Sequence, residues 1–369
     1  MNFVAMTSFA TEGITALELR DLGMKDVHCK NNRVYFSGTV DDAARACVWL
    51  RSADRVGLIA SVFHATTFDQ LFDGIKSIRW CDYISKTAAI IVDARCVKSQ
   101  LMSQRDVQRI SKKAIIDSLS KSYKTNYFPE NGYKIYISVS ILKDEASVII
   151  DLCGDGLHKR GYRSLNSEAP IRETLAASLL LLCNNKMEYF LDPFCGSGTF
   201  AIEAAMIAAN IAPGRDRSFA AEHYLFASRC FKEQKNNAFD LQKKSDCEIH
   251  CSDIDENMVE ITKYHASRAG VSIDVKCKNA IDYDDIYVYG GTMVTNPPYG
   301  ERILDREGAR ELMSDFSGIV NTLTEQYWEI GIITSEHDLE RIFCQKSASK
   351  RKLFNSNIQC TYYQFKNNT

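Results

Sequence analysis

Several common features are missing from this chain of 369 residues, and each absence argues against one class of protein. No apolar run approaches the roughly 20 residues that a membrane-spanning helix needs. No charged stretch followed by an apolar segment opens the chain, so we expect no secretory signal. The 13 cysteines form no C-x-x-C pair and the seven histidines form no H-E-x-x-H motif, so we predict no metal site. Together these absences predict a soluble, cytoplasmic protein with reduced thiols and no membrane partner.

A strong charge of one sign is also missing, because the net charge at pH 7 is only −2. The charge is nevertheless uneven: residues 1–165 carry 23 Lys and Arg against 18 Asp and Glu, and the remainder carries 22 against 29. A basic front half suits a nucleic-acid anchor, although an imbalance of this size is common. The composition, 45% apolar and 25% charged, is that of a globular protein, and the length predicts two or three domains.

The most informative stretch of the chain is residues 189–200, Y-F-L-D-P-F-C-G-S-G-T-F. Its pattern predicts a buried strand that ends at Asp192, a tight turn, and an apolar helix that begins near Gly198. Gly196 and Gly198 permit positive φ and let a ligand approach the backbone. The first helical turn then offers N–H groups to a polar ligand. Taken alone, this turn also fits a dinucleotide site or simple helix–strand packing.

A second stretch, residues 294–302, reads V-T-N-P-P-Y-G-E-R. The consecutive prolines Pro297 and Pro298 exclude a helix and fix the backbone just after a short strand. The Asn296 side-chain oxygen and the Pro297 carbonyl can then accept hydrogen bonds from a planar –NH2 group, while the Tyr299 ring stacks on the base that carries it. Such bonds favour a nitrogen that becomes tetrahedral as it attacks a methyl group. An ordinary proline-rich turn is the alternative.

Together, D-P-F-C-G-S-G-T and N-P-P-Y resemble the S-adenosylmethionine-dependent methyltransferases that act on amino groups. Three further segments narrow the resemblance to the THUMP-domain RNA guanine-N2 methyltransferases. They are G-D-G-L-H-K-R-G-Y-R at residues 154–163, A-P-I-R-E-T-L-A at residues 169–176, and N-P-P-Y-G-E-R. Within that family the chain most resembles the L module of bacterial 23S rRNA methyltransferases, over nearly its whole length. The resemblance implies an α/β fold, with a Rossmann-like seven-stranded methyltransferase domain preceded by an α+β ferredoxin-like and THUMP region.

Local patterns and this resemblance divide the chain into three predicted domains. A strand–helix–hairpin–helix order predicts a small α+β unit over residues 1–65, which the resemblance implies is an N-terminal ferredoxin-like region. Residues 66–165 are assigned to a THUMP RNA-binding domain and residues 166–369 to a class I S-adenosylmethionine-dependent methyltransferase domain. The polar stretch 213–245 is expected to be an irregular insertion over the active-site side.

Basic side chains that we expect to contact RNA fall in two groups. The first group lies on a long helix predicted over residues 103–123, where resemblance to the THUMP domain favours phosphate contact over a solvated face. The second group follows the last strand of that domain, where a phosphate grip and a solvated linker are the alternatives. The two groups are Arg105, Arg109, Lys112 and Lys113, and His158, Lys159, Arg160 and Arg163.

The resemblance also implies a set of cofactor contacts. Asp253 ends the next predicted strand, where a carboxylate can bind both ribose hydroxyls, although it could instead cap the helix that follows. Its separation from Gly196 far exceeds the ~20 residues of a dinucleotide fingerprint, which argues against NAD. Asn279 stands where most relatives place Asp to accept from the adenine amine, and Asp282 could substitute for it. The predicted S-adenosylmethionine contacts are Asp192, Pro193, Cys195, Gly196, Ser197, Gly198, Thr199, Asp253, Ile254, Asn279, Ala280 and Asn296.

The predicted reaction is methyl transfer to the N2 amine of a guanine in structured RNA, with Asn296, Pro297, Pro298 and Tyr299 as catalytic residues. We expect a monomer that acts on 23S rRNA or its assembly intermediate, with tRNA as the alternative. A DNA adenine-N6 methyltransferase would share the N-P-P-Y motif but should carry a separate sequence-reading domain. A release-factor glutamine methyltransferase should begin with a helical bundle, and the two intact motifs disfavour a noncatalytic RNA-binding protein.

Overall fold

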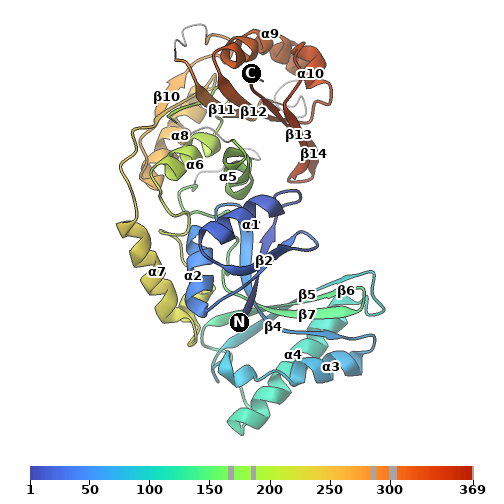
Figure 1. Ribbon diagram of the computed structural model, residues 1–369. Coiled ribbons are helices and arrows are strands. Elements are labelled where there is room, and N and C mark those ends of the chain that lie inside the picture. The colour runs from blue at the N-terminus through green and yellow to red at the C-terminus, as the bar shows by residue number, and fades with distance from the viewer. Residues whose placement is uncertain (165–169, 184–187, 284–287, 299–305, 368–369) are drawn as a thin grey trace. The chain divides into compact units, whose positions relative to one another are not determined.

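The computed structural model describes residues 1–164, 170–183, 188–283, 288–298 and 306–367 (Figure 1). The chain folds into two compact units. The first unit comprises residues 1–7, 15–157 and 214–238, and the second comprises residues 8–14, 158–213 and 239–369. The segment 214–238, called the inserted segment below, thus interrupts the sequence of the second unit and belongs to the first.

One seven-stranded sheet runs through the first unit, in the order β2-β3-β1-β4-β7-β6-β5. All neighbouring strands are antiparallel except β5 and β6. Strand β4 pairs with β1 on one side and β7 on the other, so it joins the first three strands to the last three. The strands are β1 (Asn2–Thr7), β2 (Lys25–Cys29), β3 (Arg33–Ser37), β4 (Ala53–His64), β5 (Ala89–Val97), β6 (Lys134–Leu142) and β7 (Glu145–Asp151).

The predicted order for residues 1–65 omitted β4, which is the longest strand of the sheet. Its middle, residues 56–63, is a nearly continuous apolar run, so the alternation that identifies a half-buried strand is missing. The helices between the strands are α1 (Glu12–Asp21), α2 (Val40–Trp49), α3 (Phe68–Lys76) and α4 (Gln104–Tyr123), with a 3-10 turn at Trp80–Asp82. The long helix predicted over residues 103–123 is confirmed as α4, and its N-cap is Ser103.

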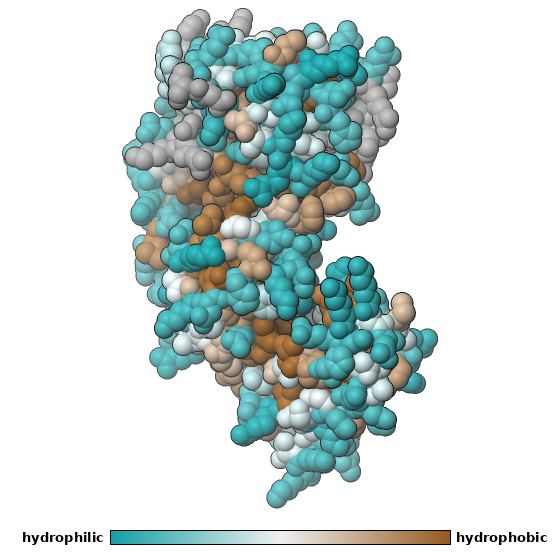
Figure 2. All heavy atoms as spheres, turned by 45° about the vertical axis from the view of Figure 1, so that its right-hand side comes forward, coloured by the Kyte–Doolittle hydropathy of each residue, from teal (hydrophilic) through white to brown (hydrophobic). Residues whose placement is uncertain are grey.

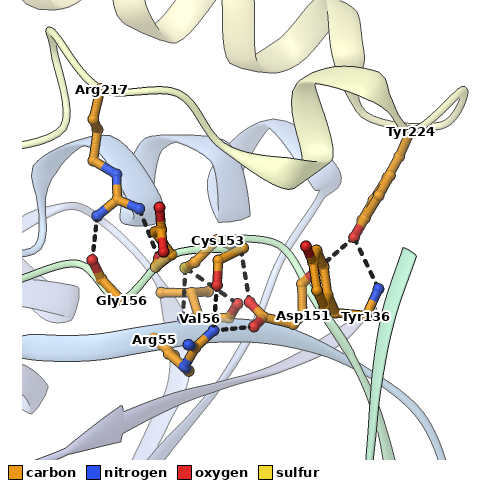
Figure 3. Close-up of polar contacts among 10 residues, drawn as sticks. Arg55, Val56, Tyr136, Asp151, Cys153, Gly156, Arg217 and Tyr224 are labelled. Atoms are coloured by element: carbon orange, nitrogen blue, oxygen red, sulfur yellow. Dashed lines mark hydrogen bonds and ion pairs between the residues drawn. The ribbon is translucent and has the colours of Figure 1, made fainter. Parts of the chain in front are cut away.

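The inserted segment is held on the first unit by buried polar contacts (Figure 3). Arg217 is only 6% exposed and donates through its two terminal nitrogens to the carbonyls of Asp155 and Gly156, each at 2.6 Å. The buried Tyr224 hydroxyl donates to the Asp151 carbonyl at 3.0 Å. Because a buried guanidinium needs partners, these contacts tie the segment firmly to the end of β7.

The prediction of an irregular insertion over residues 213–245 is wrong. The segment contains a 3-10 turn at Ala220–His223 and leads into helix α7 (Ser228–Asp240). Its residues 214–238 belong to the first unit and not to the unit that carries the two motifs. The side chains that fix it, such as Arg217, bond to residues about 60 positions away, and such distant partners leave no local pattern.

The second unit contains the predicted seven-stranded sheet, in the order β10-β9-β8-β11-β12-β14-β13, which confirms that part of the expected fold. The first five strands in this order are parallel to one another, and β14 pairs antiparallel with both β12 and β13. The strands are β8 (Tyr189–Asp192), β9 (Glu248–Asp253), β10 (Asp274–Cys277), β11 (Gly291–Thr295), β12 (Trp328–Thr334), β13 (Ser349–Asn355) and β14 (Ile358–Phe365). The helices are α5 (Glu173–Leu181), α6 (Thr199–Ala208), α8 (Glu256–Ala269), α9 (Arg306–Glu325) and α10 (Leu339–Ile342).

Helices pack on both faces of this sheet. Successive residues of a strand point to opposite faces, so neighbouring residues of β8 contact different helices. Phe190 packs in one core cluster with residues of α5 and α6. Its neighbour Leu191 packs in another cluster with Phe316 of α9 and Trp328. Strand order reverses at β8, which lies between β9 and β11, and the carboxyl ends of strands at such a point are where ligands bind in doubly wound sheets.

The surface differs from these cores in composition. On the face that Figure 2 shows, hydrophilic residues cover most of the surface and hydrophobic residues gather in smaller patches. Trp80 and Trp328 are among the largest side chains that are fully buried. No helix within the described ranges has both the length and the apolar content to cross a membrane.

Candidate active site

The turn after β8 uses its two glycines differently. Gly198 is the N-cap of α6 with φ +81°, and a Cβ there would lie 2.6 Å from a methyl carbon of Thr262, so glycine is needed for packing against α8. Gly196 has φ +50°, and a Cβ there would meet nothing within 4 Å. The space beside Gly196 is therefore open at the carboxyl end of β8, as a bound ligand would require.

Two side chains of α8 hold the carbonyls of this turn, and the sequence analysis missed both. Thr262 Oγ1 donates to the Gly196 carbonyl at 2.8 Å, and His265 Nδ1 lies 3.2 Å from the Ser197 carbonyl. Burial lowers the pKa of His265, so the neutral ring that donates through Nδ1 is favoured at neutral pH. With these carbonyls paired, the N–H groups at the start of α6 are the groups that can face a ligand.

Asp192, the last residue of β8, is 1% exposed. Its Oδ1 accepts from Thr295 Oγ1 at 2.7 Å and from the Phe194 N–H at 3.3 Å. No described residue donates to its buried Oδ2. Burial, reinforced by the charge of Asp253, raises the pKa of Asp192 to about 7. A buried carboxylate with one unmatched oxygen is costly, which suggests a positively charged or hydrogen-bond-donating ligand.

Asp253, at the end of β9, is tied to the same turn. Its Oδ2 accepts from the Gly196 N–H at 2.9 Å and its Oδ1 from the Asp255 N–H at 3.0 Å. The N-cap of α8 is Asp255, whose side chain accepts from the Asn257 N–H, so the alternative role of Asp253 as the cap is excluded. Each carboxylate oxygen has a second lone pair, so Asp253 can still accept from ligand hydroxyls.

The remaining predicted cofactor contacts lie just after two strands: Ile254 follows β9, and Asn279 and Ala280 follow β10. Ile254 is 72% exposed directly after β9, while Ala280 is buried in the core. Asn279 is half-buried, and its side-chain oxygen lies 3.4 Å from the Ile281 N–H. Asp282 is exposed. An exposed apolar side chain next to an amide at neighbouring strand ends can pack against a flat ring and bond its edge.

The N-P-P motif follows β11, which pairs in parallel with both β8 and β12. Asn296 and Pro298 are half-buried and Pro297 is buried, while Tyr299 lies outside the described residues. The Thr295–Asp192 hydrogen bond joins the end of β11 to the end of β8. Two motifs that lie about a hundred positions apart are therefore neighbours at one edge of the sheet, as expected for adjacent parallel strands.

Two of the predicted RNA contacts do not fit their surroundings. The Arg160 side chain is 2% exposed and its Nε lies 3.5 Å from Glu203 Oε1 on α6. Arg163 donates to the Thr199 hydroxyl and lies 3.5 Å from Glu173 Oε1. Arg163 therefore braces the starts of α5 and α6 and Arg160 the middle of α6, so the expected phosphate contact of these two residues is not supported. His158 and Lys159 stay predictions.

The signal for this pairing was present but ambiguous in the sequence. Glu203 interrupts the otherwise apolar helix α6 and is fully buried, where it also accepts from the Tyr162 hydroxyl at 3.2 Å. A buried acid inside an apolar helix indicates a basic partner. Which of several nearby basic residues fills that role depends on the tertiary structure alone.

The basic residues of α4 are more accessible. Arg105, Arg109 and Lys113 are exposed. Arg109 forms an ion pair with Asp106 at 3.3 Å within the helix, and Lys112 is half-buried and pairs with Glu130 at 2.8 Å. Exposed ion pairs of this kind contribute little to stability, so these side chains can exchange partners with a polyanion at small cost.

Family comparisons cover nearly the whole chain. The model of the RMKL-like methyltransferase domain matches residues 160–364, that of the RlmL ferredoxin-like domain matches residues 2–57, and that of the THUMP domain matches residues 65–151. The expected ferredoxin-like and THUMP regions in front of a methyltransferase domain are confirmed. The exact boundaries at residues 65 and 165 stay predictions.

Individual relatives are also named as methyltransferases. A Bacillus subtilis (strain 168) protein named "Putative RNA methyltransferase YpsC" is 39% identical, over 98% of this chain and 95% of its own length. "Ribosomal RNA large subunit methyltransferase K/L" of Psychromonas ingrahamii is 28% identical over 99% of this chain, which spans only 50% of that relative. The chain likewise spans about half the length of further K/L relatives.

Two solved structures match this chain over nearly its full length and over nearly their own full length. "SMU.472, a putative methyltransferase complexed with SAH" has a TM-score of 0.91 at 36% identity and covers 100% of this chain and 98% of its own. A Listeria monocytogenes structure described as a "predicted N6-adenine-specific DNA methylase" has a TM-score of 0.91 at 38% identity and covers 99% of this chain and 95% of its own. The names agree on methyl transfer and differ on the nucleic acid.

Proposed function

The chain belongs to the RMKL-like methyltransferase family, and from that premise we propose that it transfers a methyl group from S-adenosylmethionine to the N2 amine of a guanine in structured RNA. The family makes it a methyltransferase of RNA, and guanine N2 is the finer proposal. The observation that carries it is the Asp192–Thr295 hydrogen bond, which brings the glycine turn and Asn296-Pro297 to one edge of the sheet. A methyl donor and an amine acceptor held there would be side by side, as methyl transfer requires.

The residues around β8 and β9 fit S-adenosylmethionine, which supplies an activated methyl group on sulfur when bound. Asp192 Oδ2 is buried without a described partner, so it suits the ammonium of the methionine end. The open space at Gly196 suits close approach of the ligand to the backbone. Asp253 would accept from the ribose hydroxyls, and Ile254 and Asn279 would contact the adenine. The structure of a relative with SAH bound supports the same choice of ligand.

Asn296 and Pro297 would orient the acceptor amine. Their two carbonyl oxygens can accept both hydrogens of an –NH2 group, which directs the nitrogen lone pair toward the methyl group. The Tyr299 ring is proposed to stack on the extruded base, by analogy with aromatic platforms that hold single bases. Asn296 is the residue on which the reaction should depend most, because its side-chain oxygen accepts directly from the reacting amine.

RNA is favoured as the substrate because residues 65–151 match a THUMP domain and α4 exposes basic side chains. Large-subunit rRNA is the proposed RNA, since the K/L relatives carry that substrate in their names. This substrate implies a cytoplasmic place of action.

We propose a monomer as the working form, which light scattering of the purified protein can check. Adenine N6 of DNA is the second candidate, favoured by the name of the Listeria structure.

One assay separates these candidates. Unmodified transcripts of large-subunit rRNA, a tRNA pool transcribed in vitro and duplex DNA are each incubated with the full-length chain and methyl-labelled S-adenosylmethionine. The products are digested and the labelled nucleoside is identified. We expect N2-methylguanosine from the rRNA transcript. Label in N6-methyladenine would overturn the guanine assignment, and label in N2-methylguanosine of tRNA alone would overturn the rRNA assignment.

A further inference from the structure

A cavity of about 510 Å³ opens at the carboxyl ends of β11 and β12, in the second unit, directly beside the N-P-P motif. That volume lies within the range of sites that hold a small molecule or a single nucleotide. Its lining includes Pro298, Arg310 of α9, Ser335, Glu336, His337 and Gln359. None of these residues except Pro298 belongs to the site described above.

The lining is polar and carries charges of both signs. Arg310 supplies a cation on the exposed side of α9, and Glu336 supplies a carboxylate on the segment that follows β12. Gln359, the second residue of β14, adds an amide. A nucleotide combines a phosphate, which an arginine binds, with a base edge that donates and accepts hydrogen bonds. An apolar ligand would leave these groups unmatched.

The Glu336 carboxylate is held in place by its own segment. Its Oε1 accepts from the Asp338 N–H at 3.0 Å, and the Glu336 N–H donates to the hydroxyl of Thr334 at 3.1 Å. The buried Tyr363 hydroxyl donates to the neighbouring His337 carbonyl at 2.9 Å. Within the described residues no group donates to Glu336 Oε2, so this oxygen is left to accept from a ligand. A carboxylate fixed in this way is preorganised to read a donor.

We propose that this cavity receives the target nucleotide and that Glu336 accepts a hydrogen bond from guanine N1–H, which makes it the residue that selects guanine over adenine. The inference rests on the proposed function. In guanine the N1–H donor lies next to the N2 amine, whereas N1 of adenine is an acceptor that a carboxylate repels. Strands β11 and β12 are adjacent and parallel, so Asn296 after one and Glu336 after the other can bond neighbouring atoms of a single base edge. Arg310 then faces the 5′-phosphate.

This arrangement divides the recognition of guanine between two acceptors. Asn296 with Pro297 takes the N2 amine, and Glu336 takes N1–H. A site built to bond a donor discriminates strongly against an analogue that lacks it, because the buried acceptor is then left unpaired. Inosine monophosphate keeps N1–H and lacks the amine, while the monophosphate of 2-aminopurine riboside keeps the amine and lacks N1–H. The two analogues therefore report on the two acceptors separately.

The test is calorimetric titration of the full-length chain, saturated with S-adenosylhomocysteine, with GMP, inosine monophosphate, 2-aminopurine riboside monophosphate and AMP. We expect GMP to bind about tenfold or more tightly than the 2-aminopurine nucleotide and AMP, as for one hydrogen bond to a charged group. Glu336→Gln should reduce the preference for GMP over the 2-aminopurine nucleotide to about threefold or less. If the Gln oxygen keeps the Asp338 bond, its amide presents a donor that suits N1 of the analogue. The preference for GMP over inosine monophosphate should survive.

The matched control is Glu325→Gln, which removes the same charge from the exposed end of α9, outside the cavity. It should bind all four nucleotides as the wild type does, and both variants should keep wild-type affinity for S-adenosylhomocysteine. Absence of saturable GMP binding, equal binding of GMP and the 2-aminopurine nucleotide, or a Glu336→Gln protein with unchanged preference would each overturn the inference. Failure of the proposed function looks different, because it appears as a labelled product other than N2-methylguanosine.

Discussion

The sheet of the first unit is antiparallel at every pair but one, whereas the sheet of the second unit is parallel over five consecutive strands. A parallel sheet gathers the carboxyl ends of its strands at one edge, and Asp192, Asp253, Asn296 and Glu336 all lie at or just after such ends. An antiparallel sheet divides its strand ends between both edges and gathers no such set. The contribution that we propose for this unit is RNA contact through the exposed basic side of α4. On this proposal the parallel sheet holds the reacting groups and the antiparallel unit anchors the RNA.

The largest effect should come from Asn296→Ala in the parallel sheet. We expect the single-turnover methylation rate to fall by roughly a hundredfold or more, as for loss of one preorganised polar contact in a transition state. Affinity for S-adenosylhomocysteine should change little, because Asn296 acts mainly on the acceptor amine. Rapid-quench assays with labelled cofactor measure the rate, and Asn237→Ala on exposed α7 is the control. A rate near that of the wild type would contradict the proposed role of Asn296 in orienting the acceptor amine.

The next effect concerns Asp253→Ala. Loss of the ribose bonds should weaken cofactor binding by about 1.5–3 kcal/mol per charge-assisted bond, or ten- to a hundredfold. Asp255→Ala is the matched control, since it removes the N-cap of α8 and should cost about 1 kcal/mol of stability while leaving affinity unchanged. Calorimetry and thermal denaturation on both variants separate the two roles. An unaltered dissociation constant for Asp253→Ala would reduce Asp253 to a brace of the glycine turn.

Asp192 should make the parallel sheet sensitive to pH. Its folded pKa of about 7 lies above the unfolded value, so the folded state binds more protons between about pH 4 and 7. This group's contribution to the stability of the ligand-free protein therefore falls as pH rises through that window. Asp192→Asn should remove the decline and weaken S-adenosylhomocysteine binding about tenfold or more at pH 8.

Thermal denaturation at pH 5 and pH 8, with and without S-adenosylhomocysteine, checks both parts of this prediction. The Asn side chain keeps an oxygen that can accept from Thr295 and Phe194, so the fold should be retained. An Asp192→Asn protein that binds S-adenosylhomocysteine as tightly as the wild type at pH 8 would remove Asp192 from the cofactor site.

A smaller effect is expected in the antiparallel unit. Changing Arg105, Arg109 and Lys113 to Glu should make the slope of log K against log salt for RNA binding shallower by about three, because three phosphate contacts are lost. Lys112 is left in place because it pairs with Glu130. Affinity for S-adenosylhomocysteine should not change. The control carries the same charge change at the exposed residues Lys232, Lys243 and Lys244. Equal salt slopes in the two triple variants would show that the basic side of α4 is merely solvated.

The seven-stranded sheet was implied by the family resemblance, whereas the turns at its edge could be predicted from the residues themselves, for a physical reason. The turn at Gly196 and the prolines after Asn296 are local constraints on the backbone, so the residues themselves disclose them. The burial of Arg160 against Glu203 and the docking of Arg217 depend on partners tens of residues away. Strand β4 was missed because its apolar run does not alternate with polar residues, although the strand lies in the middle of its sheet.

The inserted segment shows what this limit means in practice. A fragment that ended at residue 165 would contain every strand of the first sheet but would lack Arg217 and Tyr224, whose contacts secure the end of β7. RNA binding is therefore best measured on the full-length chain. That boundary was predicted from local patterns and the family resemblance, and neither carries information about which unit a later segment joins.

The central claim is that the amine of guanine is the acceptor, and base substitution tests it most directly. Transcripts of large-subunit rRNA are prepared with inosine in place of guanosine, which removes the N2 amine, or with 7-deazaguanosine, which keeps it. Each is incubated with the full-length chain and methyl-labelled S-adenosylmethionine. We expect label in the 7-deazaguanosine transcript and none in the inosine transcript. Label in the inosine transcript at the level of an unsubstituted one would contradict it.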